Sequence, residues 1–299
     1  MKHSLTDDRL PDSPRLNMRN SVFFTLLLII FSTSHVFAAD TLEIYSDSMD
    51  RTLSAAVVMP ASYSDTADPY PVIYLLHGAT GNFSNWLTQP NVEGLVQSQA
   101  DRYGIIFVMP EGDEFSFYYD SPGNENSQFE THITREVIPH IDAHYNTIED
   151  GSGRAITGLS MGGHGALYLS ARNHGLFVAA GSMSGALNMD VEQWDLPPDG
   201  ENYFLQQLTR VLGDVEDARE FLAEHSVSNM TGLMGENELP LIIDCGVDDF
   251  LLEANRNLNR RLLEEGVPHD YIERPGAHDW EYWTNALLYQ VLFFSEIFR

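Results

Sequence analysis

Cysteine is almost absent from this chain. Cys245 is the single cysteine in 299 residues, so no intramolecular disulfide can form, and structural zinc sites built on two or more cysteines are excluded. Glycine and proline are not enriched, at 22 and 14 residues, while 43% of the residues are hydrophobic and 11% aromatic. This composition excludes collagen-like, low-complexity and disordered chains, and it suffices for one large domain or two small ones.

Positive charge is scarce as well. Sixteen Lys and Arg residues stand against 44 Asp and Glu, which gives a formal net charge of −28, and Lys2 is the only lysine. Nucleic acids and anionic membrane surfaces would repel such a chain, because proteins that bind them present a basic face. The acidic excess fits a surface adapted to salty surroundings, where screening relieves self-repulsion; ordinary acidic drift is the alternative.

The first residues have the order of a secretory signal. An uncharged apolar run at residues 22–31 follows Arg19 and precedes small residues that end at Ala39. The run is shorter than the roughly 20 residues that span a bilayer, so it predicts a cleaved signal peptide over 1–39, with an uncleaved anchor as the alternative. Acidic residues near the first Met make Met18 a second candidate for the start. We expect a periplasmic or secreted protein without stable membrane association after cleavage.

Residues 40–299 carry no repeat, low-complexity linker or charged tail, so we expect one domain there. Short β-branched or aromatic runs predict strands at 55–59, 71–76, 104–109, 154–157, 178–183, 240–245 and 270–274. Amphipathic patterns predict helices at 92–103, 129–145, 162–172, 204–212, 218–223, 252–265 and 282–298. Strands that alternate with helices indicate an α/β fold, with a mostly parallel central sheet and helices on both faces. Ligands bind such sheets at the carboxyl ends of the strands, so the chemistry is expected there.

A candidate nucleophile follows the predicted strand at 154–157. Residues 158–162 read GLSMG, the G-x-S-x-G pattern, in which glycines leave room for a strained strand-to-helix turn that exposes the serine hydroxyl at a helix N-terminus. The pattern alone is weak, because it also occurs by chance. The strand before it and the helix after it are the context that the mechanism requires. We therefore predict Ser160 as a nucleophile rather than as part of a Gly-rich turn.

A glycine-bearing loop, HGATGN at 77–82, follows the predicted strand at 71–76. In this architecture the oxyanion hole combines an N–H of that loop with the N–H of the residue after the nucleophile. We therefore expect the Ala79 and Met161 N–H groups to hold an oxyanion. Alone, the loop would be interpreted as a tight connection that closes a strand, and the pairing with Ser160 favours the functional interpretation.

The acid and the base of a triad should follow the nucleophile in the order acid, then histidine. His278 comes just after the predicted strand at 270–274, and it is the expected base: it takes the serine proton and later gives one to the leaving alcohol. Asp248 and Asp249 both follow the strand at 240–245 and compete as the acid, whereas Asp244 lies too far inside that strand. Because the base must be neutral to accept a proton, activity should fall at acidic pH.

Other candidate residues have simpler explanations. His140 and His144 share a helix face and could hold a metal, but no glutamate of a metal-binding motif separates them, and a solvated helix face is favoured. His77 and His164 are expected to pack or to support the site rather than act as bases. Candidates for contacting the substrate are Trp86, Ser184 and Trp280, with Trp283 as a further residue that could line the pocket; core or rim packing is the alternative for the tryptophans.

Six ordered segments together resemble one family: LLHGATGN…W (75–86), SFYYDSPG (116–123), GLSMGGHGAL (158–167), GSMSGAL (181–187), CGVDDFLLEAN (245–255) and PGAHDWEYW (275–283). The chain resembles, over about 45–299, the esterase D or "putative esterase" family of α/β-hydrolases. That family includes tributyrin, feruloyl and acetyl esterases, S-formylglutathione hydrolases and, more remotely, mycolyl transferases. The resemblance implies an α/β-hydrolase sheet and a lid-like excursion at about 187–238. It also implies that the acid is the residue immediately before Phe250, which is Asp249.

The resemblance also implies the activity. We expect a serine carboxylesterase that hydrolyses short-chain acyl esters, acetyl or feruloyl groups among them, through an acyl-enzyme on Ser160. Such a reaction needs neither a metal nor an organic cofactor. The expected partner is a small-molecule or glycan-linked ester, and a homo-oligomer remains open. A secretion signal counts against the formylglutathione reaction. The alternatives are acyl transfer to a sugar or lipid hydroxyl and a non-catalytic binding module on the same fold.

Overall fold

The structure is a computed structural model that describes residues 39–213 and 218–299. The predicted signal peptide therefore lies, except for Ala39, outside the described residues. None of the helices in the described ranges is both long and apolar enough to cross a membrane.

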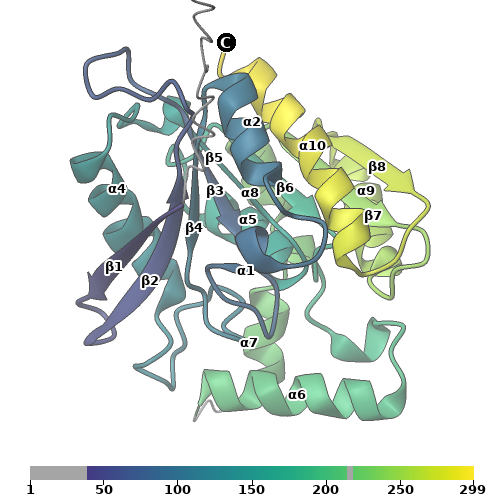
Figure 1. Cartoon of the computed structure of the whole chain (residues 1–299). Coiled ribbons are helices and arrows are strands. Elements are labelled where there is room, and N and C mark those ends of the chain that lie inside the picture. The colour runs from purple at the N-terminus through teal and green to yellow at the C-terminus, as the bar shows by residue number, and fades with distance from the viewer. Residues whose placement is uncertain (1–38, 214–217) are drawn as a thin grey trace, which may run out of the picture. The chain divides into compact units, whose positions relative to one another are not determined.

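Within the described residues, eight strands form one sheet in the order β1-β2-β4-β3-β5-β6-β7-β8 (Figure 1). The strands are β1 Asp40–Ser46, β2 Arg51–Val58, β3 Val72–Leu76, β4 Ile106–Pro110, β5 Arg154–Gly158, β6 Ala179–Met183, β7 Leu241–Gly246 and β8 Asp270–Arg274. β2 is antiparallel to both β1 and β4, and all other neighbours are parallel. All of the predicted strands are therefore present, most with ends shifted by a few residues, and the prediction of a mostly parallel sheet is confirmed.

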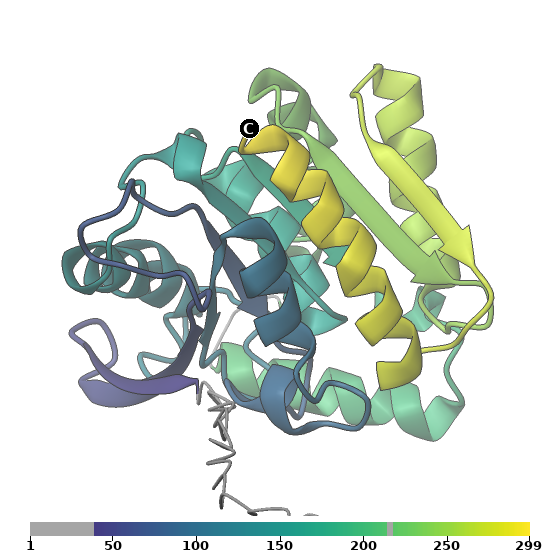
Figure 2. The ribbon, with the colours of Figure 1, turned by 45° about the horizontal axis from the view of Figure 1, so that its top comes forward.

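The helices lie on both faces of this sheet, as expected. They are α1 Asn85–Thr88, α2 Leu95–Tyr103, α3 Phe129–Thr131, α4 Ile138–His144, α5 Met161–Arg172, α6 Pro198–Leu212, α7 Ala218–Glu224, α8 Thr231–Glu236, α9 Leu252–Glu265 and α10 Trp280–Ile297. A π-helical stretch, His132–Val137, joins α3 to α4, so the predicted helix at 129–145 is one continuous helical segment. Figure 2 shows α2 and α10 over one face, while α4, α5 and α9 pack against the other.

Strand β3 shows how the sheet joins these two layers. Successive side chains of a strand point to opposite faces. Val72, Tyr74 and Leu76 accordingly belong to the core on the α5 side, whereas Ile73 and Leu75 belong to the core under α2 and α10. All five residues are fully buried, which explains why the strand reads as an unbroken apolar run rather than an alternating one.

The carboxyl ends of the parallel strands meet at one edge of the sheet. The loops after β3, β5, β7 and β8 therefore come together there, and they contain the predicted site residues. The segment between β6 and β7 contains α6, α7 and α8, and Figure 1 shows α6 across the same end of the molecule, where α10 begins. This segment includes the excursion predicted at 187–238.

Candidate active site

Ser160 occupies a strained turn between β5 and α5. Its backbone has φ 54° and ψ −116°, in the half of conformational space that residues with a side chain rarely adopt. The flanking glycines make this turn feasible. A Cβ on Gly158 would lie 2.6 Å from the Gly162 backbone, and one on Gly162 would lie 2.6 Å from the His77 carbonyl oxygen. Only glycine fits at both positions, so the sequence GLSMG folds into a turn that presents the serine hydroxyl.

Three segments far apart in the sequence bring their side chains together at this turn. His278 Nε2 lies 2.9 Å from Ser160 Oγ, and His278 Nδ1 lies 2.8 and 3.0 Å from the two carboxylate oxygens of Asp249. The carboxylate fixes the proton on Nδ1, which leaves Nε2 to accept the serine O–H. The positions of Asp248 and Asp249 in the sequence left both as candidates for the acid. Asp249 makes this contact and is buried, whereas Asp248 is exposed.

The His278 ring is also held by packing. Phe250 lies with its ring centre 4.4 Å from the imidazole, and Trp283 approaches edge-on at 4.9 Å. The loop that carries His278 ends at Asp279, whose side chain accepts a hydrogen bond from the Tyr282 N–H and so caps α10. The imidazole is therefore fixed from both sides and from its own backbone, as a base that must keep one orientation requires.

The two expected oxyanion donors lie on either side of Ser160 in the fold. Met161 is the first residue of α5, where an N–H has no acceptor within its own helix. Ala79 lies on the loop after β3, and the neighbouring Gly78 is close enough to the nucleophile turn that a Cβ there would lie 3.3 Å from Ser160 Cβ. Within the described part of the chain, neither N–H donates a hydrogen bond, so the fold itself uses neither donor.

A pocket of about 520 Å³ opens at Ser160. Its lining includes apolar side chains, among them Leu196, Phe204 and Phe250, and polar ones, among them Asn85 and Gln89. The complete lining is Gly78, Ala79, Thr80, Gly81, Asn85, Gln89, Leu159, Ser160, Leu196, Phe204, Phe250, His278, Asp279, Trp280 and Trp283. Leu196 and Phe204 come from the excursion between β6 and β7. Sequence reasoning missed them, because only tertiary packing brings α6 over the site.

Trp280 lines this pocket as expected, but two other candidates for substrate contact do not. Trp86 is 1% exposed, its indole N–H donates to the Leu76 carbonyl, and its ring packs edge-on against Trp280 at 5.1 Å. Ser184 is fully buried at the end of β6, where its N–H donates to the Asp244 carbonyl. Both expectations are corrected: Trp86 packs behind Trp280, and Ser184 is buried just after β6, where its backbone bonds to β7.

Asp244 is excluded from the site by its partners. It is fully buried within β7, and it accepts hydrogen bonds from the Tyr282 hydroxyl and from Arg274. Burial raises the pKa of this carboxyl, against the opposing effect of those two donors. Its role is to tie β7 to β8 and α10, which agrees with the expectation that it lies too far inside the strand.

Three other histidines, His164, His140 and His144, lie away from the triad. His164 is completely buried, and its Nε2 lies 3.1 Å from both the Tyr119 hydroxyl and the His225 carbonyl oxygen. Burial lowers the pKa of His164 to about 4, so the ring is neutral and serves packing. The rings of His140 and His144 stack at 4.1 Å on a helix face. In the described ranges no group of three or more His, Cys, Asp or Glu side chains could hold a metal ion.

Several known proteins are similar to this chain over most of its length. The family model described as "Putative esterase" matches residues 46–294. An acetyl esterase of Caldicellulosiruptor saccharolyticus is 27% identical, over 82% of this chain and 94% of its own. A diacylglycerol acyltransferase/mycolyltransferase of Mycolicibacterium smegmatis is 25% identical, over 72% and 73%. The solved structure of a ferulic acid esterase superposes with a TM-score of 0.71 at 28% identity, covering 88% of this chain and 98% of that one. The predicted α/β-hydrolase fold is confirmed.

Proposed function

This chain belongs to the esterase family whose model it matches and is a carboxylic ester hydrolase, and from that premise we propose that it cleaves short-chain esters through an acyl-enzyme on Ser160. The observation that carries the proposal is the line of hydrogen bonds from Asp249 through His278 to Ser160, at 2.8 and 2.9 Å. A hydroxyl, an imidazole and a buried carboxylate in this order are the parts of a serine hydrolase.

The reaction follows from the roles of these atoms. Ser160 Oγ attacks the ester carbonyl while its proton passes to His278 Nε2, and the Asp249 carboxylate stabilises the imidazolium that forms. The negative charge on the carbonyl oxygen is held by the Ala79 and Met161 N–H groups. The C–O bond then breaks, and the alcohol leaves with the proton from Nε2. Water, deprotonated by the same nitrogen, attacks the acyl-enzyme and releases the acid and the free serine.

The pocket supports an uncharged acyl group. Leu196, Phe204 and Phe250 offer apolar surface, and the lining contains no Lys or Arg that would pair with a carboxylate on the substrate. Acetyl and feruloyl groups both fit this description, and relatives named acetyl esterase and ferulic acid esterase support either choice. The polar lining residues Asn85 and Gln89 suit a hydroxylated alcohol such as a sugar.

Acyl transfer is the second candidate, and the similarity to a diacylglycerol acyltransferase/mycolyltransferase favours it. Hydrolysis and transfer share the acyl-enzyme and differ only in the nucleophile that removes the acyl group. The open pocket admits either water or a hydroxyl of a second substrate, so the balance is decided by competition between them.

The test uses the chain without its first 39 residues and a panel of p-nitrophenyl acetate, p-nitrophenyl butyrate and methyl ferulate. We expect Ser160→Ala to lower kcat by about five to six orders of magnitude with the fold intact, and intact-protein mass spectrometry to detect an acyl adduct on the parent protein alone. If Ser160→Ala retains activity near that of the parent, Ser160 is not the nucleophile. Added glycerol or glucose separates the two candidate functions, because acylated acceptor forms only in transfer.

The proposal includes a location outside the cytoplasm. It depends on the apolar run at 22–31 and on the small residues before Asp40. The N-terminus of the protein isolated from its native cells tests it: a chain that begins near Ala39 or Asp40 supports export, and a chain that retains 22–31 contradicts cleavage.

A further inference from the structure

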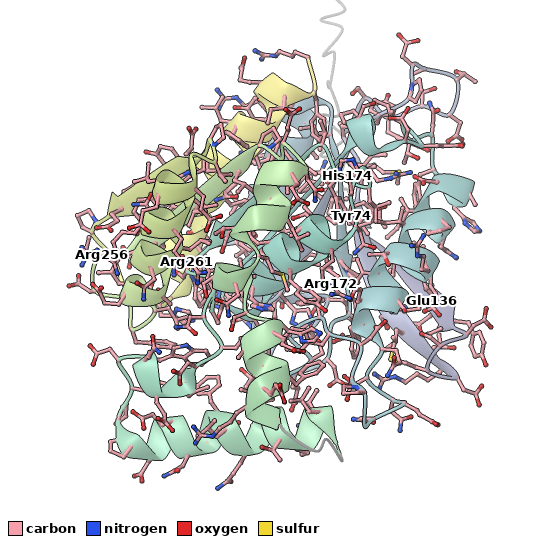
Figure 3. All side chains as sticks on the ribbon, turned by 180° about the vertical axis from the view of Figure 1, so that it is seen from behind. Tyr74, Glu136, Arg172, His174, Arg256 and Arg261 are labelled. Atoms are coloured by element: carbon pink, nitrogen blue, oxygen red, sulfur yellow. The ribbon has the colours of Figure 1, made fainter. Side chains whose placement is uncertain are left out.

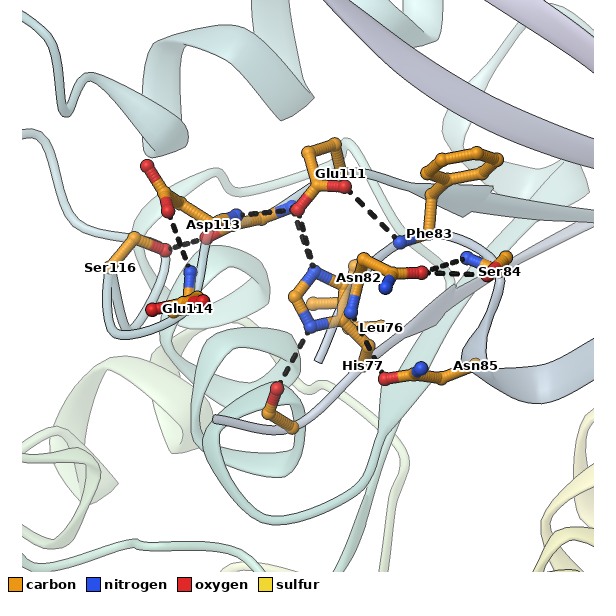
Figure 4. A network of polar contacts seen from close by, with 12 residues as sticks. Leu76, His77, Asn82, Phe83, Ser84, Asn85, Glu111, Asp113, Glu114 and Ser116 are labelled. Carbon is orange, nitrogen blue, oxygen red and sulfur yellow. Dashed lines mark hydrogen bonds and ion pairs between the residues drawn. The ribbon is translucent and has the colours of Figure 1, made fainter. Parts of the chain in front are cut away.

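The loop that carries Ala79 is held from beneath by a buried polar network (Figure 4). His77 stands at its centre and is only 1% exposed, although it is one residue from the loop glycine that approaches Ser160. Its Nδ1 lies 2.9 Å from the Gly78 carbonyl oxygen, and its Nε2 lies 2.9 Å from the Gly112 N. The triad does not use this imidazole.

The partners of His77 determine which ring nitrogen carries its proton. The Gly112 N–H is a donor only, so Nε2 must offer it a lone pair. The proton then resides on Nδ1, which donates to the Gly78 carbonyl oxygen. His77 thus accepts from one loop and donates to the other, and each nitrogen has a separate task.

The bond to Gly78 decides where the Ala79 N–H points. The Gly78 carbonyl and the Ala79 N–H belong to one peptide unit, and in a trans peptide they point in opposite directions. The carbonyl oxygen is held on the protein side by two donors, His77 Nδ1–H at 2.9 Å and the Gly81 N–H at 3.1 Å. The Ala79 N–H is therefore directed to the other side, where Ala79 and Ser160 line the pocket.

Glu111 ties the two loops together below His77. Its Oε1 accepts from the Asp113 N–H at 3.0 Å and the Gly112 N–H at 3.2 Å, while Oε2 accepts from the Phe83 N–H at 3.3 Å on the Ala79 loop. These three N–H donors favour the charged form of the carboxylate.

We infer that His77 is a positioning residue for the oxyanion hole: it fixes the Gly78–Ala79 peptide so that the Ala79 N–H faces the reacting carbonyl oxygen, and Glu111 keeps His77 and the loop in place. The inference rests on the proposed function, because an oxyanion forms only if Ser160 attacks an ester. It adds a role for a histidine that touches neither the substrate nor Ser160.

Two substitutions separate the two bonds of His77. In His77→Asn the amide nitrogen can occupy the position of Nδ1 and still donate to the Gly78 carbonyl, whereas the bond to Gly112 is lost. In His77→Gln the longer side chain reaches the position of Nε2 and can still accept from Gly112, whereas the donor to Gly78 is lost. Each variant loses one hydrogen bond, so the two should have similar melting temperatures.

Activity should distinguish them. We expect His77→Gln to lower kcat on p-nitrophenyl acetate by about 10- to 100-fold with KM within about threefold, because a misdirected donor is felt only in the transition state. We expect His77→Asn to stay within about threefold of the parent kcat. The affinity for benzeneboronic acid, which forms an anionic tetrahedral adduct with the serine, should fall in His77→Gln in parallel with kcat.

Equal kcat values for the two variants, or a change confined to KM or to the melting temperature, would overturn the inference. A crystal structure of His77→Gln gives a readout that needs no activity: the Gly78–Ala79 peptide should have rotated, and an unchanged peptide contradicts the role of His77. If Ser160→Ala retains activity, the proposed function fails instead, and the peptide orientation still decides the role of His77.

Glu111 has a matched control on the same loop. Glu111→Gln removes the charge that three N–H groups share, whereas Glu114→Gln alters an exposed carboxylate that accepts no hydrogen bond from the described residues. We expect Glu111→Gln to lower kcat by about 5- to 30-fold without a comparable change in KM, and Glu114→Gln to leave both within about twofold. Equal behaviour of the two variants would remove Glu111 from the inference.

Discussion

The strand-end loops and the excursion between β6 and β7 contribute to one pocket in different ways. The loops after β5, β7 and β8 supply Ser160, Asp249 and His278, which are bonded to one another. The excursion supplies Leu196 and Phe204, which offer only apolar surface. In the mechanism that we propose, the chemistry takes place at the carboxyl ends of the strands, and we expect the excursion to affect which substrate fits.

The two regions are nevertheless joined by a few direct bonds. The Asp195 N–H donates to the Phe250 carbonyl, one residue beyond the acid of the triad. On the other side, His164 of α5 lies 3.1 Å from the His225 carbonyl oxygen, just after α7. The excursion is thus attached at both the acid loop and the nucleophile helix. Substitutions can test whether these regions act separately.

Among the substitutions that compare these two regions, the one at the acid of the triad should give the largest effect. Asp249→Asn keeps the shape of the side chain but removes the charge that fixes the His278 tautomer, and we expect kcat on p-nitrophenyl acetate to fall by about four orders of magnitude. Asp248→Asn is the matched control, since its side chain is exposed and next in sequence. It should remain within about threefold. If Asp248→Asn lowers kcat more than Asp249→Asn does, Asp248 is the acid, and the hydrogen bonds from Asp249 to His278 and Ser160 do not carry the reaction.

A substitution in the excursion should alter selectivity rather than chemistry. Phe204 lines the pocket and packs edge-on against Trp194 and Phe115. We expect Phe204→Ala to lower kcat/KM for p-nitrophenyl butyrate by about tenfold and for the acetate by about twofold, because the longer chain buries more apolar surface. Tyr203→Ala changes a neighbouring ring that is 45% exposed and absent from the lining, and it should leave the ratio unchanged. A constant butyrate-to-acetate ratio in Phe204→Ala would show that the acyl group binds elsewhere.

The same contrast explains what the sequence could predict. The position of Ser160 could be predicted because its turn is forced by glycines that no other residue can replace, and His278 because it follows a strand. The choice between Asp248 and Asp249 could not be made from spacing, because adjacent residues differ in the direction of their side chains. The family resemblance favoured Asp249, and the structure has that side chain on His278.

Packing across the fold produced the errors. Trp86 and Ser184 follow strands or loops near the site, but the sequence does not record that one turns toward Trp280 and the other into the sheet. Strand β1 was missed although its residues alternate between exposed and buried, a pattern typical of an edge strand, because the prediction relied on the apolar runs that mark the inner strands. The short helices α1 and α8 were also missed, since a single turn has no periodicity to detect.

Stability against pH should depend on the histidine that joins the two regions. The folded-state pKa of His164 is lowered from the ordinary 6.5 to about 4, so at pH 5 the unfolded chain binds a proton there that the folded chain does not. The contribution to stability is lost as pH falls from about 6.5 toward about 4. We expect the free energy of unfolding to drop between pH 7 and 5 by about 1–2 kcal/mol more in the parent protein than in His164→Gln.

The control for this measurement is an exposed histidine of the same region. His174 is labelled in Figure 3 and lies just beyond α5, at the surface. Urea unfolding of His174→Gln should give the same pH dependence as the parent. If His164→Gln also gives that dependence, the buried ring is not the group that makes the folded state acid-sensitive, and the junction between the regions does not depend on its neutrality.

The smallest effect concerns the surface, where both regions share the acidic excess. Several arginines already pair with carboxylates, including Arg172 with Glu130 and Arg256 with Glu273. Figure 3 labels Arg172 on α5 and Arg256 on α9. Such exposed pairs contribute little, so the net charge of −28 leaves mainly repulsion. The Debye screening length falls from about 10 Å at 0.1 M salt to about 3 Å at 1 M. We therefore expect the melting temperature to rise by about 5 °C over that range of NaCl. Most of the rise should occur below about 0.5 M, because screening saturates whereas exclusion of salt from the surface grows steadily with concentration. A flat response would favour acidic drift over adaptation to salt.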